Sequence, residues 1–436
     1  MFDKIQTIFG IPELRRRILF TLGMLAVYRV GCHVPLPGVD RAVLAQFFQG
    51  TEGTLLGLVS SFTGGALERM TVFALGIMPY ISASIILQLL TVVFEPVEKL
   101  AKEGEQGRKT ITRWTRYGTV ILSIIQGAGI AIGLQSMRGP AGEPVVQAQG
   151  IGFVVLSVIT LTAGTAFIMW LGEQITERGI GNGISLVIFA GIVAEMPGAL
   201  VNSVRLIKTG ALSPALMLAI IGLMVLVIWA VVFMERGQRR VPIHYAKRVV
   251  GARSMGGQSS HLPLKINMSG VIPPIFASSI IMFPSTIASF VDVPWVQAFA
   301  AMMTPAHWLY NLCFVAFIVF FCYFYTAVTF NPADVAENIK KHGGYIPGVR
   351  PGKPTADYLD TVLGRLTFAG ALYISAICVL PTVLISQANL PFYFGGTSLL
   401  IVVGVGMDTA SQIEAHLISR SYEGFMKGVT IKGRRG

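Results

Sequence analysis

The chain alternates between long apolar blocks and shorter polar connections. Each block holds roughly 20 residues, the length that an α-helix needs to cross the hydrocarbon core of a bilayer, about 30 Å thick. Because backbone polar groups find no partners in lipid, such blocks predict transmembrane α-helices and an all-α membrane protein. The ten expected spans cover residues 18–34, 72–94, 117–136, 152–171, 183–200, 214–234, 270–290, 309–330, 366–386 and 395–414.

Spans 2 and 7 open with the same interrupted pattern, in which glycine and proline precede an apolar run. Aligned without a gap, six of eleven positions are identical: Gly76 and Gly270, Pro79 and Pro273, Ile81 and Ile275, Ala83 and Ala277, Ser84 and Ser278, Ile86 and Ile280. Paired interrupted helices in the two halves of a membrane protein point to its transport path. The shared composition of membrane helices is the other explanation of this repeat.

Composition and charge give the chain an orientation. Only 13% of the 436 residues are charged, against about 25% in soluble proteins, so a membrane protein is expected. Most of the 34 Lys and Arg residues lie in the terminal arms and in the connections after even-numbered spans, which places both termini in the cytoplasm by the positive-inside rule. Spans 2 and 7 then cross in opposite directions, as in an inverted repeat of five-helix halves. The expected parts are residues 1–200, 201–414 and a basic tail, 415–436.

Three connections carry further information. Residues 55–67 are apolar but too short to cross, which suits a re-entrant half-helix or a buried loop helix. The connection GEQITERGIGNG between spans 4 and 5 reads as a tight, glycine-rich turn. Residues 235–268 and 331–365 form long basic loops with the runs RGQRR, YAKR and IKKHGGYIPGVRPGKP. These loops serve either as topology signals or as docking surfaces for an acidic or nucleic-acid partner.

The expected spans contain few residues that could act in catalysis, metal binding or proton transfer. No nucleophile and base, metal-ligand spacing or phosphate-binding loop stands out, so nothing in the sequence favours an enzyme. Coupled transporters keep titratable groups inside their spans, and these spans have few. Isoleucines recur instead, with Ile77 and Ile81 on one helix face and Ile184 and Ile188 on another. An apolar constriction of this kind can gate by dewetting, while ordinary helix packing is the alternative.

Long motifs of this sequence closely resemble those of the SecY/Sec61 alpha family, the large subunits of protein-translocation channels. They are SFTGGALERM, FALGIMPYISASII, KEGEQGRKTITRWTRYGT, MWLGEQITERGIGNGIS, ERGQRR, YAKR, HLPLKINMSGVIPPIFASSI, GYIPGVRPGKPT and PFYFGGTSLLIVV, spread over nearly the whole chain. The resemblance implies two halves that form a clamshell, a central hourglass pore and a lateral gate. It also implies a passive pore without catalytic residues, cofactor or metal.

The resemblance assigns roles to individual residues. It implies a pore ring at Ile77, Ile81, Ile184, Ile188, Ile275 and Ile401. It implies a plug around residues 55–71, carried here by Ser61, Phe62, Thr63, Gly64, Gly65, Ala66, Leu67, Glu68 and Arg69. Signal-sequence selection at the lateral gate is implied for Ser279, Phe283 and Ile287, and partner docking for Arg239, Arg240, Lys247, Arg248, Arg253 and Arg350.

The resemblance also implies a function and partners. The channel would pass unfolded secretory polypeptides across the bacterial plasma (inner) membrane and release transmembrane helices sideways into the lipid bilayer. Its substrates would carry signal sequences, its small subunits would be SecE and SecG, and its driving partner the SecA motor ATPase or the ribosome with its rRNA. A small-solute secondary transporter with an inverted repeat is the main rival, and a membrane scaffold without a conducting path is another.

Overall fold

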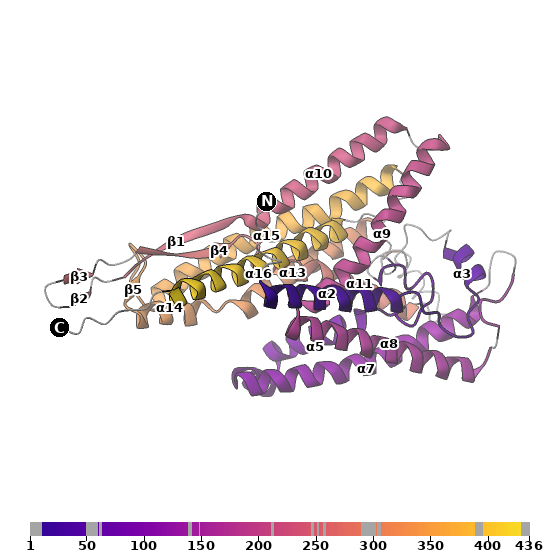
Figure 1. The fold of residues 1–436 in the computed structure, drawn as a ribbon, viewed down its shortest axis with the longest axis horizontal. Helices are drawn as coiled ribbons and strands as arrows, with labels where there is room; N and C mark the ends of the chain where they lie inside the picture. Colours follow the sequence, from indigo (N-terminus) through magenta and orange to yellow (C-terminus); the bar gives the residue numbers. More distant parts are fainter. Residues whose placement is uncertain are drawn as a thin grey trace. The chain divides into compact units, whose positions relative to one another are not determined.

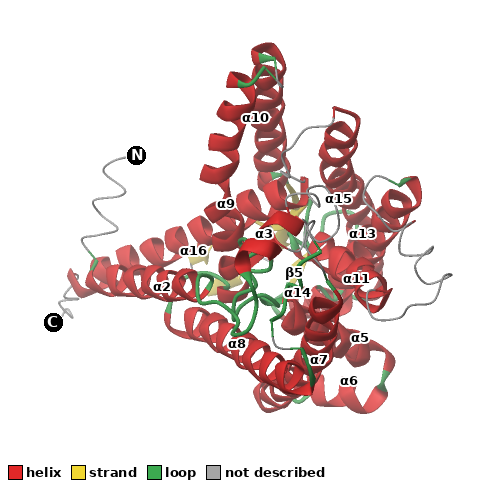
Figure 2. Cartoon of the chain, turned by 90° about the vertical axis from the view of Figure 1, so that its right-hand side faces the viewer, coloured by secondary structure: helices red, strands yellow, loops and turns green. Residues whose placement is uncertain are grey.

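The computed structural model describes residues 11–48, 60, 63–137, 142–147, 149–210, 213–245, 248–250, 253–255, 259–288, 302, 307–388 and 396–428. Helices dominate this part of the chain (Figure 2). Seven of them are long and apolar enough to cross a membrane, or eight if the bent pair α5 (Met78–Val93) and α6 (Glu95–Lys102) forms one span. The residues form two compact units: unit 1 holds Met1–Leu87, Glu103–Lys208 and Ile401–Gly436, and unit 2 holds Gln88–Lys102 and Thr209–Leu400.

Every expected span contains a helix, which confirms the predicted helical membrane fold. Besides α5, these are α2 (Pro12–Gly31), α7 (Glu105–Ser136), α8 (Ile151–Arg178), α9 (Gly183–Lys208), α10 (Pro214–Arg236), α11 (Ile272–Ala288), α13 (Trp308–Thr329), α15 (Lys353–Ala388) and α16 (Gly396–Gly428). Two short helices, α3 (Arg41–Phe48) and α14 (Pro332–Lys341), lie in connections.

The interrupted repeat has the same local structure in both copies. Gly76 and Gly270 each adopt a left-handed backbone, with φ of 55° and 63°, and each lies two residues before the first residue of its helix. A proline follows at the second helical position, where its missing N–H has no helical partner to lose. Helix α5 therefore begins at Met78, later than the expected start of span 2, and residues 72–77 form turns.

Unit 1 packs its helices closely around small residues. Helix α8 contacts α2, α7 and α9, and α7 lies beside α8 along most of its length (Figure 1). A Cβ added to Gly164 of α8 would lie 2.1 Å from the carbonyl oxygen of Val72, so glycine permits this approach of helix to backbone. A core cluster fills the unit beside these helices: Leu36, Val43, Leu44, Leu67, Met70, Ala74, Leu75, Ala131, Leu134, Val145, Val146, Phe153 and Leu161.

Unit 2 contains a β-hairpin that the polar composition of its loop did not predict. Strands β1 (Gln238–Tyr245) and β4 (Ser259–Lys265) pair antiparallel, and β5 (Gly344–Tyr345) adds to the other side of β1. Strands β2 (Arg248–Val250) and β3 (Arg253–Met255) pair beyond their far end (Figure 1). The hairpin has its own apolar core, formed by Val241, Leu264, Ile346, Leu359, Val362 and Leu363. In the same unit α13 packs against α11 and α15.

Candidate functional site

The described part of the expected plug, residues 63–70, is held against helix α2 through its main chain. The Tyr28 hydroxyl donates to the carbonyl of Thr63 over 3.3 Å, and Arg29 Nη1 donates to the carbonyl of Gly64 over 2.8 Å. The thiol of Cys32 lies 4.0 Å from the carbonyl of Thr63. Two successive carbonyls thus contact two side chains from the last turn of α2 and that of Cys32, the residue directly after it.

Two glycines shape this segment. Gly64 and Gly65 both have positive φ, 66° and 75°, and residues 64–70 form turns. Of residues 55–67, expected as a half-helix or a buried loop helix, the described Ser60 and Thr63 are helical. A Cβ on Gly64 would lie 2.9 Å from the Cα of Gly191 on α9, and one on Gly65 would lie 3.2 Å from Oε1 of Glu195. The segment therefore fits closely against α9 as well as α2.

The remaining plug residues divide by exposure. Thr63, Ala66 and Leu67 are buried, whereas Glu68 and Arg69 are exposed. The guanidinium of Arg69 lies 2.9 Å from Nε2 of His33 at the end of α2. Backbone hydrogen bonds close the far end of the segment, from Leu36 to Met70 and from Val72 to Val34. Ser61, Phe62 and residues 55–59 lie outside the described residues.

Five of the six ring isoleucines lie in helices, as expected, whereas Ile77 lies in the turn directly before α5. Ile77, Ile81, Ile188, Ile275 and Ile401 are buried, and Ile184 is half-buried. Ile275 belongs to unit 2 and the other five to unit 1. Their burial fits an apolar constriction as well as helix packing, so the ring itself stays a prediction.

Among the three residues expected at the lateral gate, Ser279 is the one whose side chain is described. It is buried in α11, and its hydroxyl donates to the carbonyl of Ile275 over 2.8 Å. That hydrogen bond satisfies the hydroxyl within its own helix. Phe283 and Ile287 belong to the same helix by their backbone, while their side chains lie outside the described part.

The basic residues expected to dock a partner lie on the hairpin and on the connection to α15. Arg239 and Arg240 are exposed on β1, and Arg350 is exposed just before α15. The nearby helix α14 holds an ion pair of 2.9 Å between Lys341 and Glu337, and the hydrogen bond from this lysine lowers the pKa of the Glu337 carboxyl. Lys247 lies outside the described residues, as do the side chains of Arg248 and Arg253.

A polar junction between the hairpin and α11 was not singled out by the sequence. Nδ2 of Asn267 donates to Oε1 of Glu235 over 2.5 Å and to the carbonyl of Gly270 over 3.1 Å. Oδ1 of the same amide accepts from the Ser269 hydroxyl over 3.1 Å. Asn267 is only 4% exposed, so its amide joins the end of α10 to the start of α11. The available signal was two polar residues, Asn267 and Ser269, directly before the glycine of an interrupted span.

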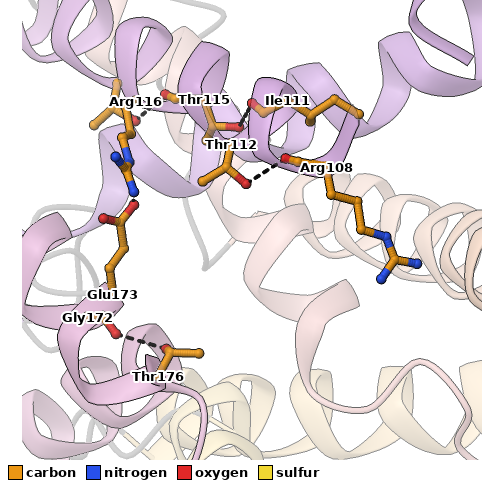
Figure 3. Close-up of polar contacts among 9 residues, drawn as sticks. Arg108, Ile111, Thr112, Thr115, Arg116, Gly172, Glu173 and Thr176 are labelled. Atoms are coloured by element: carbon orange, nitrogen blue, oxygen red, sulfur yellow. Dashed lines mark hydrogen bonds and ion pairs between the residues drawn. The ribbon is translucent and has the colours of Figure 1, made fainter. Parts of the chain in front are cut away.

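Only residues 179–182 of the glycine-rich connection between spans 4 and 5 lie outside helices, because α8 continues to Arg178 and α9 begins at Gly183. Hydrogen bonds hold this joint. Arg116 of α7 and Glu173 of α8 point toward one another and pair over 2.8 Å (Figure 3). One turn later the Thr176 hydroxyl donates to the carbonyl of Gly172 and accepts from the backbone of Gly183, both over 2.9 Å. The joint therefore ties α7, α8 and the start of α9 together.

Within the described residues, no three His, Cys, Asp or Glu side chains are grouped so that they could hold a metal ion. The four cysteines form no disulfide, and Cys32, Cys322 and Cys378 are buried. Around residues 63–70 the polar contacts are those of the Tyr28 hydroxyl, the Arg29 guanidinium and the Cys32 thiol with backbone carbonyls.

Comparisons with known proteins agree over nearly the whole chain. The SecY family profile matches residues 71–410. The protein translocase subunit SecY of Pseudomonas aeruginosa is 51% identical over 97% of this chain and 96% of the relative, and that of Aquifex aeolicus is 46% identical over 98% and 100%.

Solved structures agree in fold. A protein-conducting channel is 18% identical, with a TM-score of 0.62 over 95% of this chain and 97% of the other. A SecY whose plug domain stabilises the closed state of its channel gives 0.64 at 19% identity, over the same shares of the two chains.

Proposed function

Since the chain belongs to the SecY family, we propose that it forms the polypeptide-conducting channel of a protein translocase. Unfolded secretory polypeptides pass through it, and apolar helices leave it sideways into lipid. The observation that carries this proposal is the attachment of residues 63–70 to α2 and α9. Because side chains of α2 bind carbonyls that any sequence would offer, the segment can be released and rebound without change to the surrounding helices.

The constriction in this proposal is the ring of six isoleucines. Apolar side chains around a narrow constriction exclude water and ions until a translocating polypeptide occupies the constriction. They hold no particular substrate, which suits a channel for many polypeptide sequences. A small-solute transporter would instead need fixed coordinating or titratable groups in its spans, and solute uptake by the purified chain would favour that rival.

The crosslinking pattern of two isoleucines tests the function. With a photoreactive residue at Ile81, we expect crosslinks to a secretory polypeptide halted during export, because Ile81 is buried on α5. Ile159 on α8, which is 62% exposed, is the matched control and should give no such crosslink. The measurement is the yield of the crosslinked polypeptide on a gel. Equal yields at the two positions would contradict a central path.

The sideways exit is part of the same proposal. Ser279, Phe283 and Ile287 belong to α11, a helix that follows directly on the hairpin junction. A signal sequence entering beside α11 would meet one face of this helix. Polarity on that face would then set how hydrophobic a signal sequence must be.

The partners and the location complete the proposal. The exposed arginines of the hairpin and of the connection to α15 dock the ribosome, through its RNA, or the SecA motor. The solved Sec61 of a canine ribosome-channel complex supports such docking by fold, with a TM-score of 0.59 over 95% of this chain and 97% of that chain. SecE and SecG complete the channel in the bacterial plasma membrane, and both termini of the chain are cytoplasmic. The channel needs no cofactor and catalyses no reaction, so the energy comes from the partner.

Reversing the charge of Arg350 tests docking. Arg350→Glu should weaken partner binding about tenfold or more, as for a central arginine of an interface, and slow translocation to match. Lys208→Glu, an exposed charge at the end of α9, is the control. The measurement is partner affinity alongside the export rate of membrane vesicles. Normal affinity in the Arg350 variant would refute its docking role, provided that both variants fold.

A further inference from the structure

The connection between the docking hairpin and helix α11 is short, irregular and tightly held. Strand β4 ends at Lys265 and α11 begins at Ile272. Free residues in between would act as a swivel, since an irregular linker absorbs displacement. Here hydrogen bonds and close contacts hold the linker at Ile266 and again at Asn267, so it cannot swivel freely.

The first fixation holds the root of the hairpin. The backbone N–H of Ile266 donates to the carbonyl of Gly237 over 3.0 Å, which joins the linker to the end of α10. A Cβ on Gly370 of α15 would lie 2.9 Å from the carbonyl oxygen of Ile266. The root therefore lies between α10 and α15 at backbone contact distance.

The second fixation is Asn267, which uses both ends of its amide. Its two N–H groups reach the Glu235 carboxylate and the Gly270 carbonyl, and its oxygen accepts from Ser269. Bonds to an ionised carboxylate are among the stronger hydrogen bonds of proteins. Asparagine suits this place because an aspartate would lose both donors and set a second carboxylate beside Glu235.

We propose, on the basis of the proposed function, that Asn267 is a positioning residue that couples the docking hairpin to α11. When a partner displaces the root of the hairpin, where β1 follows closely on α10, the hydrogen bonds of Asn267 to Glu235 and Gly270 make residues 266–270 move with it, and the start of α11 follows. Helix α11 carries Ile275 and Ser279, so the displacement reaches a ring position and a gate position together. Without these hydrogen bonds, residues 266–270 change conformation when the hairpin moves, and α11 stays in place.

The test compares partner binding with the response of α11. The readout is a photoreactive residue at Ser279 and the rise in its crosslinking to a signal sequence when the partner is added. In Asn267→Ala we expect unchanged partner affinity but a rise reduced about tenfold, because a hydrogen bond to a charged group is lost. Asn338→Ala, an exposed asparagine on α14 of the same unit, should behave like the wild type.

Variants of the second partner separate coupling from folding. Glu235→Gln keeps an acceptor for Asn267 and should retain most of the response, whereas Glu235→Ala should lose it. The double variant Asn267→Ala, Glu235→Ala should be no worse than the more impaired single variant, as for two groups that act as one. If Asn267→Ala does not fold, Ser269→Ala loosens the same amide and should reduce the response in the same direction.

The outcomes are distinguishable. A full response in folded Asn267→Ala, or additive losses in the double variant, would overturn the coupling and leave the channel proposal intact. A wild-type chain that gives no crosslink to a signal sequence with bound partner would overturn both. Weaker partner binding in Asn267→Ala would also overturn the coupling, because the defect would then lie in docking.

Discussion

Replacing Arg29 with leucine is expected to open the resting channel to ions. Arg29 donates the shortest hydrogen bond between α2 and residues 63–70, 2.8 Å to the carbonyl of Gly64, and leucine cannot replace it. A hydrogen bond to a charged group contributes about 1.5–3 kcal/mol. Its loss would shift the balance between bound and released plug by roughly ten- to a hundredfold. The measurement is the ion conductance of the purified complex in a planar bilayer without partner.

Two further variants make this result specific. Arg16→Leu removes an exposed charge from the other end of the same helix and should leave the conductance low. Arg29→Lys keeps one charged donor and should fall between the wild type and leucine, since lysine is a compact point charge on a different stem. A closed Arg29→Leu channel would mean that the remaining contacts hold the segment alone.

The second large effect concerns stability. Gly164→Ala would place a Cβ 2.1 Å from the carbonyl oxygen of Val72, and the backbone of Val72 is itself bonded to Val34. Neither side can yield cheaply, and overpacking of this kind costs about 1–3 kcal/mol. We expect a lower thermal midpoint for the solubilised protein, followed by intrinsic fluorescence.

The matched control, Gly133→Ala, is expected to change the thermal midpoint in the opposite direction. Gly133 lies in α7, and a Cβ there would meet nothing within 4 Å. Gly133→Ala should therefore raise the midpoint slightly, because alanine favours the helix by up to about 1 kcal/mol. If both variants destabilise equally, the close contact at Gly164 is not what limits stability.

Much of the fold follows from the sequence because a chain that crosses lipid must pair its backbone polar groups internally, as helices do. Apolar blocks of about 20 residues predict helices reliably, and the glycine and proline of spans 2 and 7 mark where α5 and α11 begin. The hairpin was missed because only two apolar residues of β1, Val241 and Ile243, alternate with exposed residues, and a proline, which is unfavourable in strands, lies between them. A short alternation of this kind is a weak strand signal.

The contacts that hold the site were beyond sequence reasoning for a different reason. Arg29 was visible as a charge inside an apolar run, and such a charge is a default functional candidate in a membrane. Its partner is a backbone carbonyl 35 positions away. Every residue has such a carbonyl, so the sequence does not indicate which one Arg29 contacts. Asn267 and Glu235 are 32 positions apart, and nothing in the sequence predicts that these two side chains form a hydrogen bond. The convergence of the ring and the two inverted halves stay predictions.

The pairing of β1 with β4 restricts how related chains can change in length. Val241 faces Leu262 across the hairpin; Val241 belongs to the apolar core, and Leu262 packs against it. One inserted residue in either strand would turn every following side chain to the opposite face; an insertion before Arg240, for example, would place Arg240 inward and Val241 outward. Insertions and deletions among homologues should therefore fall between Tyr245 and Ser259, outside the paired run, or come two residues at a time.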